Sequence, residues 1–208
     1  MMPDMLSKLA AVSEYALLER RFRDVEGWLS GVEGYALMLM AAHGPGAGEI
    51  VEIGSWMGKS ACWLAAGSKS AQREKVHAVD PFDGGPMLAD RDIIREEGTT
   101  YHRFVDNLTR VELFDHVEPI VATSGLAVRK WDKPIRLLFI DGDHSYEAVR
   151  ADFEAWSAFL VLGALVAFDD AVGQYEGVSR YYEALLESDR RYVEIARVGK
   201  MKIIQRLT

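Results

Sequence analysis

Two apolar runs in the second half of the chain each end in aspartate, and they constrain the fold more than any other feature. The runs are IRLLFI (Ile135 to Ile140), followed by Asp141, and ALVAF (Ala164 to Phe168), followed by Asp169 and Asp170. An uninterrupted apolar run of this length is typical of a strand that is buried on both faces, as in parallel sheets covered by helices. In such sheets, ligands bind in the crevice beyond the carboxyl ends of the strands. The sequence therefore predicts three carboxylates at neighbouring strand ends, able to converge on one divalent cation.

Strand patterns and helix patterns alternate along the chain from Glu49 onward. The expected strands are IVEI, VHAVD, VEPIVA, IRLLFID and ALVAFDD, and helices are expected at 58–67, near 99–109, near 125–130, at 146–160 and at 175–188. This alternation predicts an α/β fold, a doubly wound sheet with helices on both faces. Two final runs, RYVEIARV and KMKIIQRL, flank a turn at Gly199 and leave no room for a crossover helix. We expect them to pair as an antiparallel hairpin.

Residues 1–48 are predicted to form a helical extension that covers a core domain at 49–208. Apolar residues recur at helical spacing up to about Ala42, and the segment HGPGAG (His43 to Gly48) then breaks the pattern. Within the core domain, a polar segment at 82–99 begins with glycines and a proline and continues as a charged helical pattern. Such a segment is suited to a lid over a site.

Composition and charge exclude several classes of function. The formal net charge is −8, and no cluster of Lys and Arg is evident, which argues against nucleic-acid binding. The single cysteine, Cys62, excludes an internal disulfide and any zinc site with several thiolates. No apolar stretch is long enough to span a bilayer, and the N-terminus lacks the apolar core of a signal peptide. We therefore expect a cytoplasmic protein with no membrane partner; its oligomeric state stays open, a homo-oligomer included.

The segment EIGSWMGKS (Glu52 to Ser60) leads from a strand into a helix through a glycine loop that has three interpretations. As a phosphate-binding loop of the Walker A type it is one residue short, because only three residues separate Gly54 from Gly58. As a dinucleotide fingerprint it has Trp56 in place of the second glycine. The third interpretation is a loop for S-adenosylmethionine, a nucleoside cofactor that carries a sulfonium and no phosphate.

Two carboxylates favour the third interpretation. Glu52 lies on the first strand, and Asp80 ends the next strand, where an acidic residue binds ribose hydroxyls in such folds. Ser60, near the helix N-terminus, is placed to hold the carboxylate of the cofactor together with free backbone N–H groups. For the glycines taken alone, an ordinary strand-to-helix turn with a capping serine is the structural alternative.

These segments together resemble the class I S-adenosylmethionine-dependent methyltransferases. The resemblance is to their metal-dependent O-methyltransferase branch, methyltransferase family 24, and its small subfamily acting on sugar-bearing natural products. It runs from about Glu49 to the C-terminus and rests on EIGSWMGKS, VHAVDPFDG and ATSGLA, and above all on LLFIDGDHSYEAVRADFEAW with ALVAFDD. It implies a Rossmann-like, mostly parallel sheet of seven strands in the order 3-2-1-4-5-7-6, with an antiparallel last strand.

The resemblance also implies roles for individual residues. Those expected to contact S-adenosylmethionine are Glu52, Gly54 and Ser60 at the methionine part, Asp80 at the ribose, Ser124 and Phe82 at the adenine, and Asp141. The expected metal ligands are Asp141, Asp169 and Asp170. Oxygen-only ligation favours Mg²⁺ over zinc, with calcium or manganese as substitutes.

The general base implied by the resemblance is His144, three residues beyond the first metal aspartate. A neutral imidazole can accept a proton from a hydroxyl whose acidity a metal has raised. Asp143 is the rival, since some members of the family use the acid two positions beyond that aspartate. The implied reaction is methyl transfer to a hydroxyl of a small molecule, either a sugar-bearing natural product or a catechol or phenol. A non-catalytic S-adenosylmethionine- or nucleotide-binding module and a P-loop nucleotide hydrolase remain as alternatives.

Overall fold

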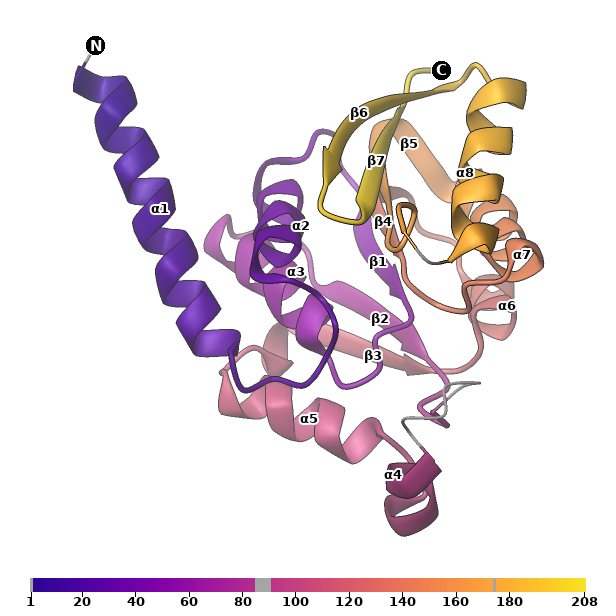
Figure 1. Ribbon diagram of the computed structural model, residues 1–208, viewed down its shortest axis with the longest axis horizontal. Coiled ribbons are helices and arrows are strands. Elements are labelled where there is room, and N and C mark those ends of the chain that lie inside the picture. Colours follow the sequence, from indigo (N-terminus) through magenta and orange to yellow (C-terminus); the bar gives the residue numbers. More distant parts are fainter. Residues whose placement is uncertain (1, 85–90, 174) are drawn as a thin grey trace.

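The computed structural model describes residues 2–84, 91–173 and 175–208 and consists of a twisted sheet with helices on both sides (Figure 1). The strands are β1 (Glu49–Ile53), β2 (Val76–Asp80), β3 (Val117–Val121), β4 (Ile135–Ile140), β5 (Leu160–Phe168), β6 (Tyr192–Val198) and β7 (Met201–Arg206). The α-helices are α1 (Met2–Phe22), α2 (Gly31–His43), α3 (Lys59–Ser70), α4 (Arg91–Glu97), α5 (Tyr101–Arg110), α6 (Ser124–Ala127), α7 (Tyr146–Trp156) and α8 (Glu176–Ser188). Short 3₁₀ turns are η2 (Phe114–His116), η3 (Val128–Lys130) and η4 (Ser157–Phe159).

Within the described residues, seven strands form one sheet in the order β3-β2-β1-β4-β5-β7-β6. The neighbours from β3 to β5 are parallel, and β7 is antiparallel to both β5 and β6. The predicted strand order and the predicted C-terminal hairpin are thus confirmed. Gly199 forms the hairpin turn with a φ of +58°, a left-handed conformation that glycine adopts without steric cost.

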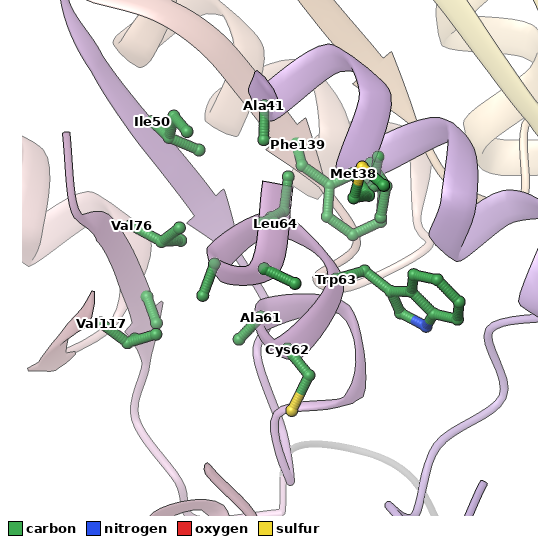
Figure 2. Packing of buried hydrophobic residues seen from close by; sticks show 14 of the residues in the cluster. Met38, Ala41, Ile50, Ala61, Cys62, Trp63, Leu64, Val76, Val117 and Phe139 are labelled. Atoms are coloured by element: carbon green, nitrogen blue, oxygen red, sulfur yellow. The ribbon is translucent and has the colours of Figure 1, made fainter. Parts of the chain in front are cut away.

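Alternate residues of the central strands pack into two separate cores, one on each face of the sheet. In β4, Leu137 and Phe139 face the core under α2, α3 and α5, whereas Leu138 and Ile140 face the core under α6, α7 and α8. This alternation is the period-2 pattern of a strand buried on both faces. Figure 2 shows the first core, where the side chain of Phe139 meets helix α2 at Met38 and helix α3 lies beside β1 and β2. The fully buried Cys62 lies there as a small apolar residue.

Helix α2 packs directly on helix α3, so the end of the N-terminal segment is part of the core. A Cβ at Gly67 would lie 2.1 Å from the carbonyl oxygen of Met38, and a Cβ at Gly34 would lie 2.3 Å from the indole of Trp63. Glycine at both positions therefore allows the two helices to approach closely. Helix α1 projects away from the sheet (Figure 1). It contacts the body from about its midpoint onward. The hydroxyl of Tyr35 in α2 donates to Ala11 O at 3.1 Å, and Phe22 at the end of α1 is buried.

The boundary between α7 and β5 differs from the sequence-based prediction. The helix predicted over 146–160 ends as an α-helix at Trp156, and the strand begins at Leu160, four residues before the predicted start at Ala164. The early part of β5 is irregular, because its register with β4 shifts and Gly163 has a φ of +82°. The sequence alone suggests that a strand is interrupted at such a glycine, although β5 continues through Gly163.

The predicted insertion at 82–99 has its two ends tied together, and residues 85–90 of it lie outside the described residues. Thr100 N and Thr99 Oγ1 both donate hydrogen bonds to the carbonyl oxygen of Phe82, at 3.0 Å and 2.8 Å. The charged helical pattern within the insertion forms α4. Among the described residues, none of the helices combines the length and the apolar character needed to cross a membrane.

Candidate active site

Backbone hydrogen bonds align the ends of three neighbouring strands. Asp141 N donates to Ile53 O of β1 at 2.9 Å, and Asp169 N donates to Ile140 O of β4 at 3.0 Å. Both bonds extend the parallel ladder by one residue beyond the strands, so the two aspartates emerge side by side at the same edge of the sheet. Asp170 then turns back with a φ of +52°, a conformation that is uncommon outside glycine and is often found at functional sites.

The predicted acidic residues form one cluster at this edge. One ligand atom from each of Asp141, His144 and Asp170 can be chosen so that all three lie within 4.8 Å of one another. Asp169 lies beside them and is only 2% exposed. Its Oδ1 is buried without a hydrogen-bond partner among the described residues. Burial, and then the charge of Asp141, raise the pKa of Asp169 above its usual range.

A lysine from the distant hairpin lies between the tandem carboxylates. Lys200 Nζ donates to Asp169 Oδ2 at 2.8 Å and lies 3.0 Å from Asp170 Oδ1. Adjacent carboxylates repel unless a positive charge compensates them, and in this structure the compensating charge is the ammonium group of Lys200. Burial opposes this ammonium, but the two aspartates outweigh it and raise the pKa of Lys200. The sequence analysis missed Lys200, because nothing in its local sequence links it to residues 31 positions earlier.

His144 faces the acidic cluster, and an aromatic ring stacks on its imidazole. Its Nε2 lies 3.5 Å from Asp141 Oδ1 and 3.2 Å from Asp170 Oδ2, in neither case with hydrogen-bond geometry. The ring of Tyr175 stacks on the imidazole, with centroids 4.1 Å apart. Burial disfavours the imidazolium, but the carboxylates outweigh burial and raise the pKa of His144. Ser145, the next residue, is the N-cap of α7.

Asp143, the rival for the general base, is exposed and is engaged in the turn before α7. Its Oδ1 accepts a hydrogen bond from Ser145 N at 2.7 Å. Hydrogen bonds from Ser145 lower the pKa of Asp143, so this carboxylate is a weaker base than an ordinary aspartate. The geometry therefore favours His144 over Asp143.

The glycine loop lies directly against the first aspartate of the cluster. Gly54 has a φ of +85°, and a Cβ there would lie 2.0 Å from the carbonyl oxygen of Asp141. Glu52, two residues before Gly54, is fully buried, and its Oε2 accepts a hydrogen bond from Ser55 Oγ at 2.6 Å. Its other oxygen, Oε1, has no hydrogen-bond partner among the described residues. Burial raises the pKa of Glu52 to about 7, against the lowering effect of Ser55 and Ser60.

Asp80 fastens the glycine loop to the end of β2. Its Oδ2 accepts from Trp56 N at 2.8 Å and its Oδ1 from Phe82 N at 2.6 Å. A carboxylate has about four acceptor sites, so Asp80 can still accept a further hydrogen bond. Burial raises the pKa of Asp80. The ring of Trp28, 57% exposed, packs against Trp56 with centroids 4.4 Å apart, so the segment before α2 borders this loop.

The two residues expected near an adenine ring lie in different surroundings. Phe82 is fully buried against Tyr101 and Phe104, so in this structure its ring belongs to the core. Ser124 is half-buried, and its Oγ accepts a hydrogen bond from Trp156 Nε1 at 2.9 Å. Contacts of either residue with a cofactor remain predictions.

The residues at the strand ends suit a divalent cation. Three carboxylates supply oxygen donors, which hard cations prefer, and their mutual repulsion would be relieved by such an ion. The buried oxygen Asp169 Oδ1, which lacks a hydrogen-bond partner, adds a donor with unused capacity.

Comparison with known proteins identifies the family and the fold of the chain. A model of the methyltransferase domain, family 24, matches residues 51–171, more than half of the chain. Among solved structures, the O-methyltransferase from Bacillus cereus, in complex with SAH, is 20% identical with a TM-score of 0.64 and covers 96% of this chain and 91% of its own. TomG from Streptomyces achromogenes, involved in tomaymycin synthesis and solved with SAM, is 18% identical with a TM-score of 0.64, over 95% of this chain and 90% of its own.

A methyltransferase from Geobacter sulfurreducens is 22% identical with a TM-score of 0.61, over 100% of this chain and 96% of its own. These three likenesses show a shared fold, and the family model covers the glycine loop and all three aspartates. The chain thus belongs to methyltransferase family 24 and has the fold of the class I S-adenosylmethionine-dependent methyltransferases.

Proposed function

We propose that the protein is a metal-dependent O-methyltransferase that methylates a hydroxyl group of a small molecule, with S-adenosylmethionine as the donor. The observation that carries the proposal is the convergence of Asp141, His144 and Asp170 within 4.8 Å. The cluster lies directly beside the glycine loop, because Gly54 packs on the backbone of Asp141. A donor site and an acceptor site would therefore adjoin.

The cofactor side of the site is assigned to the glycine loop and the end of β2. S-adenosylmethionine, when bound, supplies an electrophilic methyl group that an acceptor oxygen can attack in line. Glu52 and Ser60 would hold its methionine part, and the buried, hydrogen-bond-deficient Glu52 Oε1 is suited to a positively charged amino group. Asp80 would accept the ribose hydroxyls with its remaining lone pairs.

The acceptor side is assigned to the carboxylates. Asp141, Asp169 and Asp170 would hold a divalent cation, with Mg²⁺ first in line because the donors are all oxygen. When bound, such an ion lowers the pKa of the acceptor hydroxyl and fixes its orientation. His144 Nε2 faces this position and would take the hydroxyl proton; the surrounding carboxylates then stabilise the imidazolium that forms.

For the methyl acceptor, the proposal names a chemical class and no single compound. The proposed acceptors are sugar-bearing natural products and catechols or phenols, chosen by the segment around Trp28 and by the insertion at 82–99. The O-methyltransferase neighbours, among them NovP, 18% identical with a TM-score of 0.63, support an oxygen atom as the methyl acceptor. The exposed Trp28 ring beside Trp56 offers an apolar surface near the glycine loop on which a sugar or phenol ring could pack.

The test is methyl transfer to a panel of sugar, catechol and phenol hydroxyls, with and without a chelator. We expect product only with a divalent cation, and at least about 100-fold less turnover for Asp169→Asn, because the metal supplies activation that no other group replaces. Asp115→Asn is the control with unchanged turnover, because it removes an exposed carboxylate just before the amino end of β3, whereas the cluster lies at the carboxyl ends of the strands. Calorimetry should show that Asp169→Asn still binds S-adenosylhomocysteine. Full activity of Asp169→Asn, or tight binding of ATP in place of S-adenosylhomocysteine, would contradict the proposal.

A further inference from the structure

The ammonium group of Lys200 bridges Asp169 and Asp170, two of the carboxylates that the proposed function assigns to a cation. Its Nζ lies 2.8 Å from Asp169 Oδ2 and 3.0 Å from Asp170 Oδ1, so one oxygen of each carboxylate already faces a positive charge. Asp169 is almost entirely buried, so water cannot replace this charge compensation. In the protein as described, Lys200 therefore neutralises the carboxylates that the proposed function assigns to a metal.

The backbone of Lys200 is fixed, whereas its side chain has an exit. Its N–H donates to Glu33 Oε1 at 2.8 Å, and its carbonyl oxygen accepts from Val172 N at 3.1 Å. Glu33 is itself buried and packs closely under Gly199, whose Cβ position would lie 2.3 Å from Glu33 Oε1. The Lys200 side chain is 27% exposed, and its flexible four-carbon stem can carry the ammonium into solvent while the turn stays in place.

We infer that Lys200 is a displaceable counter-ion of the acidic cluster, which holds Asp169 and Asp170 in place until a divalent cation binds and thereby sets the affinity of the site for that cation. The inference rests on the metal site of the proposed function. A divalent ion held by the other oxygens of these two carboxylates would lie close to the ammonium, and the repulsion between the two positive charges opposes its binding unless the ammonium moves into solvent. Lys200 acts here as a positioning residue, since it touches the carboxylates and no reacting atom.

This role predicts effects that an ordinary structural ion pair would not give. Loss of a structural partner weakens both the fold and any site built on it. Loss of a competing counter-ion lowers stability without metal, because the carboxylates then repel one another, but it raises the affinity for metal. The two effects have opposite signs.

The test is direct binding of Mn²⁺, followed by electron paramagnetic resonance, to the wild-type chain and to Lys200→Met. We expect Lys200→Met to bind Mn²⁺ about tenfold more tightly or better, because the competing charge is gone. Lys202→Met is the matched control. It removes an equal charge two residues farther along the hairpin, in β7, where Lys202 Nζ lies 4.5 Å from the ring centroid of Tyr182. This variant should bind Mn²⁺ within about twofold of wild type. Lys200→Arg keeps the charge and should bind no more tightly than wild type.

Thermal unfolding gives a second readout. Without metal, Lys200→Met should melt below the wild type, and saturating Mg²⁺ should raise its melting temperature by more than it raises that of the wild type. If Lys200→Met does not fold without metal, Lys200→Gln, which can still donate to a carboxylate, replaces it in the same experiment. Equal or weaker Mn²⁺ binding by the folded variant overturns the inference and leaves metal-dependent methyl transfer standing. Absence of Mn²⁺ binding in both variant and wild type overturns the inference and the metal assignment together.

Discussion

Gly54 packs so closely on Asp141 that a Cβ at Gly54 would lie 2.0 Å from the Asp141 carbonyl oxygen. This contact joins the glycine loop to the acidic cluster, and it explains why a side chain is excluded there. The contacting atom belongs to the backbone, which cannot move aside as the end of a flexible side chain can. A side chain at Gly54 would therefore force the loop to shift away from β4.

Gly54→Ala should therefore destabilise the fold by about 3 kcal/mol, from the left-handed φ and the clash together. Urea unfolding measures this loss. Gly98→Ala is the control, because Gly98 has a φ of +75° but has nothing within 4 Å of its Cβ position among the described atoms. It should lose only about 1 kcal/mol, the share due to φ alone. Equal losses of unfolding free energy in the two variants would show that the close contact with Asp141 adds nothing to the cost of the substitution.

Glu52 should make stability depend on pH in the neutral range. Its pKa is raised from 4.5 to about 7 in the folded chain, so between these values the folded state holds a proton that the unfolded state has lost. The contribution of Glu52 is therefore fully present below pH 4.5 and is lost as the pH rises through about 7, by about 3 kcal/mol in total. Glu52→Gln should remove this part of the slope when free energies of unfolding are compared from pH 5 to pH 8. Parallel curves for wild type and variant would contradict the assignment.

His144→Asn should lower kcat by about 100-fold or more, whereas Asp143→Asn should change it by less than about threefold. The reason is that His144 Nε2 faces Asp141 and Asp170, whereas the Asp143 carboxylate points to Ser145 N in an exposed turn. Steady-state kinetics at saturating S-adenosylmethionine and Mg²⁺ measure both values. Circular dichroism checks that neither substitution disturbs α7. The reverse order of the two effects would make Asp143 the base.

Arg136→Met should destabilise the fold by about 3 kcal/mol or more, although it lies far from the proposed chemistry. Arg136 is fully buried in β4, where it pairs with Glu74 and donates to the carbonyl oxygens of Met40 and Ala41 at the end of α2. Its loss would leave those groups without a buried donor. A double-mutant cycle with Glu74→Gln, followed by thermal unfolding, separates the ion pair from the bonds to α2. Full additivity of the two substitutions would show that the pair itself contributes nothing.

The strands and the acidic cluster were predictable because each depends on a local pattern. The run IRLLFI followed by Asp141 marks both a buried strand and its end, and parallel strands place their ends at one edge. The sheet order and the antiparallel β7 followed from the family resemblance and are confirmed. The start of β5 was misplaced, because Gly163 breaks the apolar run without breaking the strand.

Contacts between distant parts of the chain were not predictable in this way. Lys200 reaches Asp169 because a hairpin inserts β7 next to β5, and Arg136 reaches the end of α2 across the sheet. The burial of Phe82 depends on Tyr101 and Phe104, which return from beyond the insertion. A pattern of neighbouring residues does not predict contacts between distant residues, because these contacts depend on how the elements pack in three dimensions.

The carboxylate of Glu33 is shared between the start of α2 and the turn of the C-terminal hairpin. Its Oε2 accepts from Ser30 N at 2.9 Å, and its Oε1 accepts from Lys200 N at 2.8 Å. Two parts of the chain 167 positions apart are thus fastened by one buried acid. A movement of the segment around Trp28 that displaces Ser30 would therefore remove a donor from the same carboxylate that holds the backbone of Lys200.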